Sequence, residues 1–285
     1  MKELKIGGVP EHFNLPWRLA IENKAFDPLG LHVDWVDMEG GTGQMITELE
    51  AGGLDIAILL TEGITLAILQ GLEAKIAGIY VQSPLRWGIH VSKQLQQEQD
   101  LSLNDKVYAI SRKGSGSQLM AHVKAFQENW DFSSPKFEVV GNLEGGIKAL
   151  QRNSAQVFLW EKYTTQPYVD ENKCARIDEV LTPWPCFVIA VRNSVAQNFE
   201  NELIAIQTIV SGYAKKLKKL PEAKRLFSER YDLEPSQVQQ WLSETEWSSG
   251  NHLDKQLFDT VIDYLEKTGL IKEETTKNWE ERLFL

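Results

Sequence analysis

The chain has 285 residues, of which 42% are hydrophobic and 25% are charged, proportions typical of a globular protein with one large core or two modest ones. Forty acidic against 30 basic residues give a formal net charge of −10, which argues against a nucleic-acid-binding surface because phosphate binding needs a basic face. No window approaches the roughly 18 apolar residues that cross a bilayer, so no membrane span is predicted.

The first residues run directly into an alternating strand, without an apolar segment or a small-residue cleavage site, so no signal peptide is predicted. We therefore expect the chain as encoded to be cytoplasmic, or periplasmic or lipid-anchored if a leader has been removed. Cys174 and Cys186 lie far from any further Cys or His at metal-ligand spacing. We expect incidental thiols and no metal site.

The first half of the chain alternates strands and helices. Strands are predicted at 4–9, 31–36 and 55–60 and through Ala77 and Tyr80, with helices near Trp17, through Leu49 and after a loop at 61–63. This alternation predicts an α/β lobe with a mainly parallel sheet.

From Trp87 the pattern restarts. Strands are predicted around Ile89 and at 107–110, 137–140 and 157–160, helices at 118–130 and 147–152, and loops at 112–117 and 141–146. The segments 39–41, 55–58 and 61–63 of the first half correspond to 144–146, 156–159 and 161–163 of the second. This internal repeat predicts a duplicated, two-lobed design.

Proline-rich segments at 83–87 and 182–186 are predicted to be hinges, because proline presets φ and resists ladder pairing. After a strand at 186–191, helices are predicted at 196–219, 221–231, 235–242 and 253–268, and this tail is expected to pack on the first lobe. We expect lobe 1 to comprise residues 1–85 and 187–285, and lobe 2 residues 86–186.

In open α/β sheets, ligands bind at the carboxyl ends of the strands, where helix N-termini present free N–H groups. The loop at 114–117 is the most suggestive of these ends, since glycines let the backbone approach a ligand and serines add hydroxyl groups. The predicted ligand-binding residues are His12, Asn14, Thr42, Gly43, Thr61, Glu62, Gly114, Ser115, Gly116, Ser117, Asn142, Trp160, Glu161 and Trp184.

Catalytic patterns are missing from these loops. No P-loop, dinucleotide fingerprint or nucleophile elbow occurs. Glu62 and Glu161 suit acid–base chemistry, but equally a pair of anchors for a polar ligand or simple surface exposure. His12 suits either ligand contact or a structural hydrogen bond. Four tryptophans flank the loops and hinges as candidates for ring stacking on a ligand: Trp17, Trp87, Trp160 and Trp184.

A resemblance to a known fold rests on the lobe order and on four segments: 8–16 (GVPEHFNLP), 40–43 (GGTG), 55–58 (DIAI) and 182–185 (TPWP). The chain resembles the type 2 periplasmic-binding fold, in the branch of sulfonate-binding proteins and thiamine-pyrimidine-synthase-like proteins. The resemblance implies a two-lobed α/β clamshell with mixed sheets flanked by helices and a helical C-terminal tail. It further implies one small organic solute bound in the inter-lobe cleft, without a cofactor, and an ABC transporter permease as candidate partner.

The chain departs from the pyrimidine synthases. Those enzymes carry a lysine that holds pyridoxal phosphate and a histidine consumed in the reaction, near the strand that here reads ILLTEG at 58–63, and neither residue is present. They also have a cysteine cluster, whereas the returning hinge here has only Cys186. We therefore favour a binding protein over a cofactor-using enzyme. The carboxylates of Glu62 and Glu161 favour a heteroaromatic, thiamine-pyrimidine-like solute with N–H groups. The alternative is a sulfonate held by nearby cations, Arg86, Arg112 and Lys113.

Overall fold

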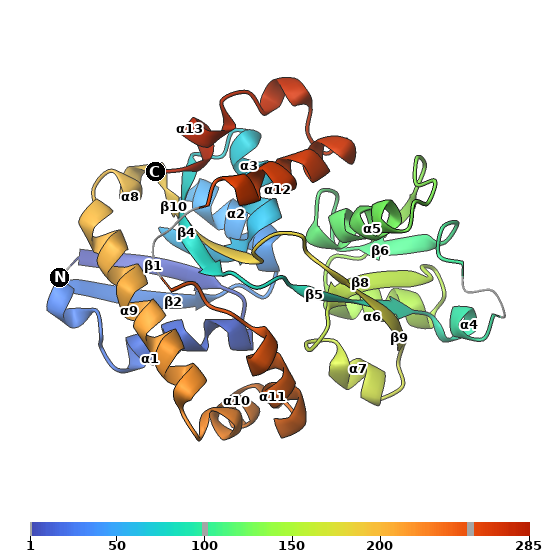
Figure 1. The fold of residues 1–285 in the computed structure, drawn as a ribbon, viewed down its shortest axis with the longest axis horizontal. Coiled ribbons are helices and arrows are strands. Elements are labelled where there is room, and N and C mark those ends of the chain that lie inside the picture. Colours follow the sequence, from blue (N-terminus) through green and yellow to red (C-terminus); the bar gives the residue numbers. More distant parts are fainter. Residues whose placement is uncertain (1, 99–101, 250–253) are drawn as a thin grey trace. The chain divides into compact units, whose positions relative to one another are not determined.

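The computed structural model describes residues 2–98, 102–249 and 254–285. The chain divides into two compact units. Unit 1 comprises Met1–Pro84, Trp184–Asp263 and Ile271–Leu285, and unit 2 comprises Leu85–Pro183 and Tyr264–Leu270. Each unit contains its own five-stranded sheet with helices packed on it (Figure 1).

The sheet of unit 1 has the order β2-β1-β3-β10-β4. Its strands β1 and β3 are parallel, as are β1 and β2, whereas β10 is antiparallel to both β3 and β4. The central strands are almost continuous apolar runs because both of their faces are buried. The strands are β1 (Lys2–Gly8), β2 (Leu31–Asp37), β3 (Ile56–Leu60), β4 (Ala74–Val81) and β10 (Phe187–Arg192).

The helices of unit 1 come from both halves of the chain. In the first half they are the 3-10 turns η1 (His12–Asn14) and η2 (Asp27–Leu29) and the helices α1 (Leu15–Glu22), α2 (Gly41–Ala51) and α3 (Thr61–Leu69). The C-terminal part adds α8 (Asn193–Ala196), α9 (Glu200–Lys219), α10 (Ala223–Tyr231), α11 (Pro235–Glu244), η3 (Glu273–Thr275) and α13 (Trp279–Leu283). Helix α12 (Gln256–Lys267) begins in unit 1, and Tyr264–Leu270 groups with unit 2. Leu253, the predicted start of this helix, lies outside the described residues.

The sheet of unit 2 has the order β7-β6-β8-β5-β9, with β6 parallel to β7 and β8, and β5 antiparallel to β8 and β9. A core cluster of Ile147, Leu150, Phe158 and Cys174 packs on one face. The elements are β5 (Arg86–Val91), α4 (Lys93–Gln96), β6 (Val107–Ile110), α5 (Gly116–Gln127), β7 (Lys136–Val139), α6 (Leu143–Gln151), β8 (Val157–Glu161), α7 (Gln166–Asp170) and β9 (Ala175–Leu181).

The two sheets have the same order when β1, β2, β3, β10 and β4 are matched to β6, β7, β8, β5 and β9. In both units four strands run in one direction and a single strand, β10 in unit 1 and β5 in unit 2, runs antiparallel between two of them. The predicted α/β class, with mixed sheets and a helical C-terminal region, is confirmed. The expected mainly parallel arrangement holds for four strands of each sheet, and the sheets are mixed because β10 and β5 run antiparallel to their neighbours.

Several predicted boundaries need correction. Residues 61–63, expected as a loop, are helical because α3 begins at Thr61. The loop expected at 112–117 ends at Ser115 because α5 begins at Gly116. The helix expected over 196–219 is two helices. Asn198 donates a side-chain hydrogen bond of 2.7 Å to the carbonyl of Ser194, which closes α8 before α9 begins at Glu200.

The glycine pairs of the internal repeat are not equivalent. Gly40 precedes α2, whereas Gly145 and Gly146, expected in a loop, lie in the first turns of α6. A Cβ on Gly146 would lie 2.3 Å from the ring of Phe158, so the helix approaches β8 closely only because this position has no side chain. The Gly-Gly match between the halves therefore reflects two different requirements.

Candidate functional site

At the carboxyl end of β3, Glu62 lies in the first turn of α3 and is only 2% exposed. Its Oε2 accepts a 2.9 Å hydrogen bond from Nε1 of Trp184, which is equally buried. A carboxylate in the first turn of a helix is also favoured by the helix dipole. Two predicted binding residues are thus brought together, but they bind each other within unit 1.

Thr61 connects the carboxyl end of β3 to the segment that leads into β10. Its hydroxyl donates to the carbonyl of Pro185, and its N–H donates to Cys186 over 3.1 Å. From the start of α2, the Thr42 hydroxyl accepts a 3.3 Å hydrogen bond from the N–H of Leu60. The predicted residues Thr42, Thr61, Glu62 and Trp184 therefore form one polar cluster in unit 1.

Gly43 and His12 have local roles. The carbonyl of Gly43 accepts a 3.2 Å hydrogen bond from the Thr47 hydroxyl inside α2. The ring of His12 is buried 4.3 Å from that of Trp241, edge to face, and 4.7 Å from that of Phe13. Burial lowers the pKa of His12 to about 3, so the imidazole is neutral. His12 is a packed member of an aromatic cluster.

Asn14 has a different environment at the end of β1. Its Nδ2 donates a 2.8 Å hydrogen bond to the carbonyl of Val9, while its buried Oδ1 has no hydrogen-bond partner among the described residues. A Cβ on Gly8 would lie 2.9 Å from Nδ2 of Asn14 and 2.6 Å from the ring of Trp35. Asn14 and Trp35 therefore both lie against the buried backbone of Gly8, and Oδ1 of Asn14 is a buried acceptor at this strand end.

In unit 2, the Gly-Ser loop connects β6 to α5. Gly114 has φ +73°, a conformation that favours glycine. The hydroxyls of Ser115 and Ser117 lie 2.9 Å apart, and that of Ser117 also accepts from the N–H of Ser111 over 3.0 Å. Ser115 occupies the N-cap position, yet no described side chain caps the helix. The N–H groups that begin at Gly116 keep their capacity to bind an acceptor.

The other predicted residues of unit 2 act locally. Asn142 is exposed, and its Oδ1 caps α6 by accepting from the N–H of Gly145 over 2.9 Å. Trp160 is half-buried with its ring 5.3 Å from that of Phe158. Neither residue presents a buried polar atom without a partner.

Glu161, at the end of β8, is 5% exposed and closes its own turn. Its Oε2 accepts hydrogen bonds from the N–H and the hydroxyl of Thr164, at 2.6 and 2.7 Å. Burial raises the pKa of Glu161, and these hydrogen bonds oppose the shift. Glu62 and Glu161 therefore each have a hydrogen-bond partner within their own unit.

Trp87 on β5 lies directly opposite Glu161 in the antiparallel ladder, so both side chains are on the same face of the sheet. Its side chain is 4% exposed, and its Nε1–H has no hydrogen-bond partner among the described residues. The sequence indicated this residue only as a ring for stacking. A buried indole N–H at a strand end is instead a donor available to a ligand.

Trp35, which the sequence did not indicate as a site residue, lies on β2 near its carboxyl end. Its Nε1 donates a 3.1 Å hydrogen bond to Asp37, which also pairs with Arg18, and the Arg18 guanidinium lies 5.0 Å from the Trp35 ring centre. The only sequence signal was its place at the end of an alternating strand. Trp17, by contrast, is fully buried in the core.

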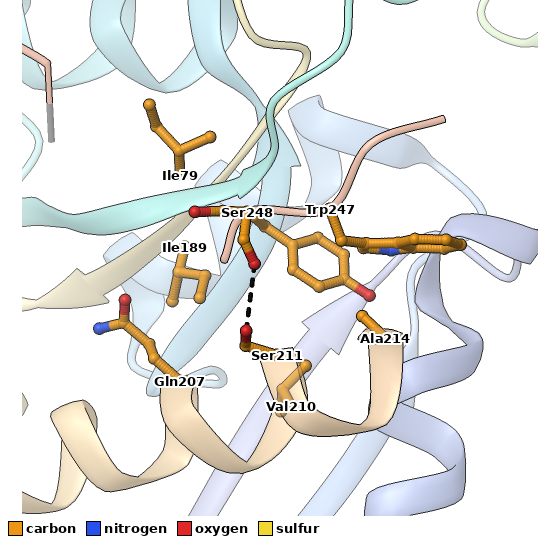
Figure 2. A pocket seen from close by; sticks show the side chains of 9 residues that line it. Ile79, Ile189, Gln207, Val210, Ser211, Ala214, Trp247 and Ser248 are labelled. Carbon is orange, nitrogen blue, oxygen red and sulfur yellow. Dashed lines mark hydrogen bonds between the residues drawn. The ribbon is translucent and has the colours of Figure 1, made fainter. Parts of the chain in front are cut away.

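A small pocket lies elsewhere in unit 1, between β4, β10 and α9 (Figure 2). It has space for about one water molecule. Ser211 bridges it with a 3.2 Å hydrogen bond to the carbonyl of Ser248, as Figure 2 shows. This pocket is a packing gap. Across the described ranges, no cluster of three or more His, Cys, Asp or Glu side chains forms a possible metal site.

The chain is similar in sequence and in structure to known proteins. A model of the Ca3427-like PBP family matches residues 87–180. The solved structure of the Candida albicans CA3427 gene product, described as having the generic periplasmic binding protein fold, superposes with a TM-score of 0.89 at 25% identity, over 100% of this chain and 96% of that chain. The chain has the type 2 periplasmic-binding fold. No curated protein matches it in sequence.

More distant structures share this periplasmic-binding fold. The aliphatic sulphonate binding protein SsuA from Escherichia coli has a TM-score of 0.73 at 13% identity, over 100% of this chain and 92% of that chain. SsuA from Xanthomonas axonopodis pv. citri, solved bound to MOPS, has a TM-score of 0.75 at 13% identity, over 96% and 95%. The predicted resemblance to this fold is confirmed. No helix in the described part of the chain is both long and apolar enough to cross a membrane.

Proposed function

We propose that this protein binds one small organic solute through the strand-end loops of its two units. The observation that carries the proposal is that two of the buried polar atoms without partners in the described residues lie at strand ends next to the predicted loops: Oδ1 of Asn14 in unit 1 and Nε1 of Trp87 in unit 2. Buried polar atoms in folded proteins nearly always have a hydrogen-bond partner, and each exception requires an explanation. A donor group on a solute would satisfy Asn14, and an acceptor group would satisfy Trp87.

The proposed site keeps all the predicted residues but divides their roles. Asn14, Trp87 and the start of α5 at Gly114–Ser117 contact the ligand. The remaining residues hold the strand ends in place through the hydrogen bonds and ring contacts described above: His12, Thr42, Gly43, Thr61, Glu62, Asn142, Trp160, Glu161 and Trp184.

Two solute classes follow from this arrangement. A heteroaromatic, thiamine-pyrimidine-like compound offers both the donor for Asn14 and an acceptor for Trp87. The uncapped start of α5 favours an acceptor group such as a sulfonate, in line with the sulfonate-binding proteins of the same fold. Because Glu62 and Glu161 are bound within their own units, a binding protein is favoured over the alternative of a cofactor-using enzyme.

We assign the protein to solute uptake or intracellular solute carriage. As the binding component of an ABC-type importer it would act outside the cytoplasm and deliver its solute to a permease. As a carrier or sensor it would act inside the cytoplasm without that partner.

Hinged movement at the two crossings belongs to the same proposal. Of the four points where the chain passes between the units, two lie close to the predicted hinges at 83–87 and 182–186, namely Pro84–Leu85 and Pro183–Trp184; the others are Asp263–Tyr264 and Leu270–Ile271. Thr182 and Leu85 exchange two hydrogen bonds, of 2.9 and 3.1 Å, which keep these segments paired. Ligand-induced closure about such segments is common. Small-angle scattering should show compaction on ligand saturation, and an unchanged radius of gyration would contradict hinged closure.

The binding proposal is tested by a thermal-shift panel of aminopyrimidines, thiazoles, alkyl sulfonates and phosphate. We expect one class to raise the melting temperature of the wild-type protein. Trp87→Phe, which removes only the N–H, and Asn14→Ala should weaken that stabilisation, whereas the control Trp130→Phe should not. Equal stabilisation of all four proteins would show that the two buried atoms do not contact the solute.

A further inference from the structure

A basic segment surrounds the turn between α9 and α10 in unit 1. Residues 215–225 contain six Lys or Arg and a single carboxylate, Glu222, in a chain whose net charge is −10. All six cations are exposed. Figure 1 shows α9 running down to this turn and α10 leading away from it, at the bottom of the view. The basic patch consists of Lys215, Lys216, Lys218, Lys219, Lys224 and Arg225.

Local stability accounts for only part of this charge. Cations in the last turn of α9 are favoured by the helix dipole, which explains Lys216, Lys218 and Lys219. Lys224 and Arg225 lie in the first turn of α10, which contains no acidic residue, and there the same dipole disfavours cations. Their position therefore opposes helix stability and calls for a different explanation.

Few carboxylates neutralise the basic patch. Arg225 approaches Glu229 at 3.8 Å, and Lys215 and Lys224 donate to the neutral oxygens of Ser249 and Gln239. Within the described ranges, no carboxylate lies at ion-pair distance from Lys218 or Lys219. Most of the positive charge of the patch is therefore available to a binding partner.

An apolar residue lies in the middle of these cations. Leu220 is 41% exposed at the C-terminal end of α9, between Lys219 and Pro221. The preceding apolar residue of the helix, Leu217, is buried, so Leu220 is not part of the core-facing stripe. An exposed leucine ringed by flexible lysines matches a bilayer interface, where the side chain enters the acyl boundary while the amines reach the headgroups.

We propose that the basic patch binds the surface of an anionic lipid bilayer. Clusters of four to eight Lys and Arg on an amphipathic helix are typical of binding to acidic phospholipids. The patch is formed by a helix end and a turn, whose lysines can adapt to a fluid array of headgroups. This inference does not depend on the identity of the solute.

The test is co-sedimentation of the full chain with vesicles of phosphatidylcholine alone or mixed with phosphatidylserine. Binding should occur only to the mixed vesicles and should disappear at high salt. Each lysine at the surface contributes about fivefold in affinity, so Lys218→Ala with Lys219→Ala should weaken binding by about 30-fold. Leu220→Ser should also weaken it and leave the salt dependence in place.

The matched control is Lys93→Ala with Lys136→Ala, two exposed lysines of unit 2 whose loss changes the net charge equally. It should bind the mixed vesicles like the wild type. Absence of binding at low salt, or equal loss in both double variants, would overturn the proposal. Retention on immobilised polyglutamate without vesicle binding would also overturn it, and would indicate an acidic protein partner instead.

Discussion

Unit 1 and unit 2 share one strand order but finish their strand ends in different ways. In unit 1, side chains close the end of β3 through the Glu62–Trp184 and Thr61–Pro185 hydrogen bonds. In unit 2, the counterpart of β3 is β8, whose end is closed by the hydrogen bonds of Thr164 to Glu161, whereas the start of α5 after β6 receives no hydrogen bond from its N-cap side chain. Equivalent strand ends of the duplicated scaffold are therefore closed by different side-chain contacts, and the start of α5 is one of the helix starts that keep backbone donors for a ligand.

Removing the Glu62 carboxylate tests this difference most strongly. We expect Glu62→Ala to lower the free energy of unfolding by about 3 kcal/mol, because it leaves the buried N–H of Trp184 without its charged acceptor. Urea unfolding followed by Trp fluorescence measures the loss. Glu62→Gln keeps an acceptor and should cost about 1 kcal/mol. If both variants are as stable as the wild type, unit 1 is not held together at this strand end.

The pH dependence of stability tests the buried histidine of each unit. Burial lowers the pKa of His12 in unit 1 to about 3 and that of His90 in unit 2 to about 4, from the ordinary value of 6.5. The unfolded chain therefore binds more protons than the folded chain below pH 6.5. Stability is fully present above that pH and falls as the pH falls toward the folded-state values, with about 2 kcal/mol lost per histidine at pH 5.

Urea unfolding at pH 7, 6 and 5 measures this loss for each unit. His12→Leu and His90→Gln should each remove about half of the pH dependence, whichever way they change stability at pH 7. His32→Ala, at an exposed histidine, is the matched surface variant and should leave the contributions of the two buried histidines in place. A pH dependence that survives both single variants in full would contradict the assignment to buried histidines.

The smallest expected effects concern Gly146, in the first turn of α6, and Gly41, the first residue of α2. Gly146→Ala in unit 2 should cost about 2 kcal/mol, because the new methyl group overlaps the Phe158 ring. Gly41→Ala in unit 1 meets no neighbour but must adopt φ +63°, which costs about 1 kcal/mol. Thermal melts of both variants give the comparison. Equal costs would mean that the two glycines serve the same purpose after all.

The strands were the most predictable part of the fold. The strand β6 was predicted at its observed limits, and β3 and β8 to within one residue, because buried apolar runs between turn residues have few alternatives. The strand β9 was missed. Its sequence contains Arg176, Asp178 and Glu179, and such charges are typical of an edge strand and hide the alternating pattern.

The placement of the candidate residues at strand ends was predictable from the sequence, but their contacts were not. Topology alone indicated which loops follow the strands, and those loops do contain Asn14 and Gly114–Ser117. It did not reveal that Trp184 would bind Glu62 or that Thr164 would bind Glu161, because such partners meet only through tertiary packing. The orphaned N–H of Trp87 has no sequence signature, since burial without a partner is a property of the folded chain.

Native mass spectrometry of the purified protein tests the central claim most directly. The wild-type protein should carry a co-purified small molecule that mild activation releases. Gly116→Val, which adds bulk at the start of α5, should lack this molecule while melting at nearly the wild-type temperature. A wild-type protein that binds no small molecule from any source, or a Gly116→Val variant that retains it fully, would contradict solute binding at this loop.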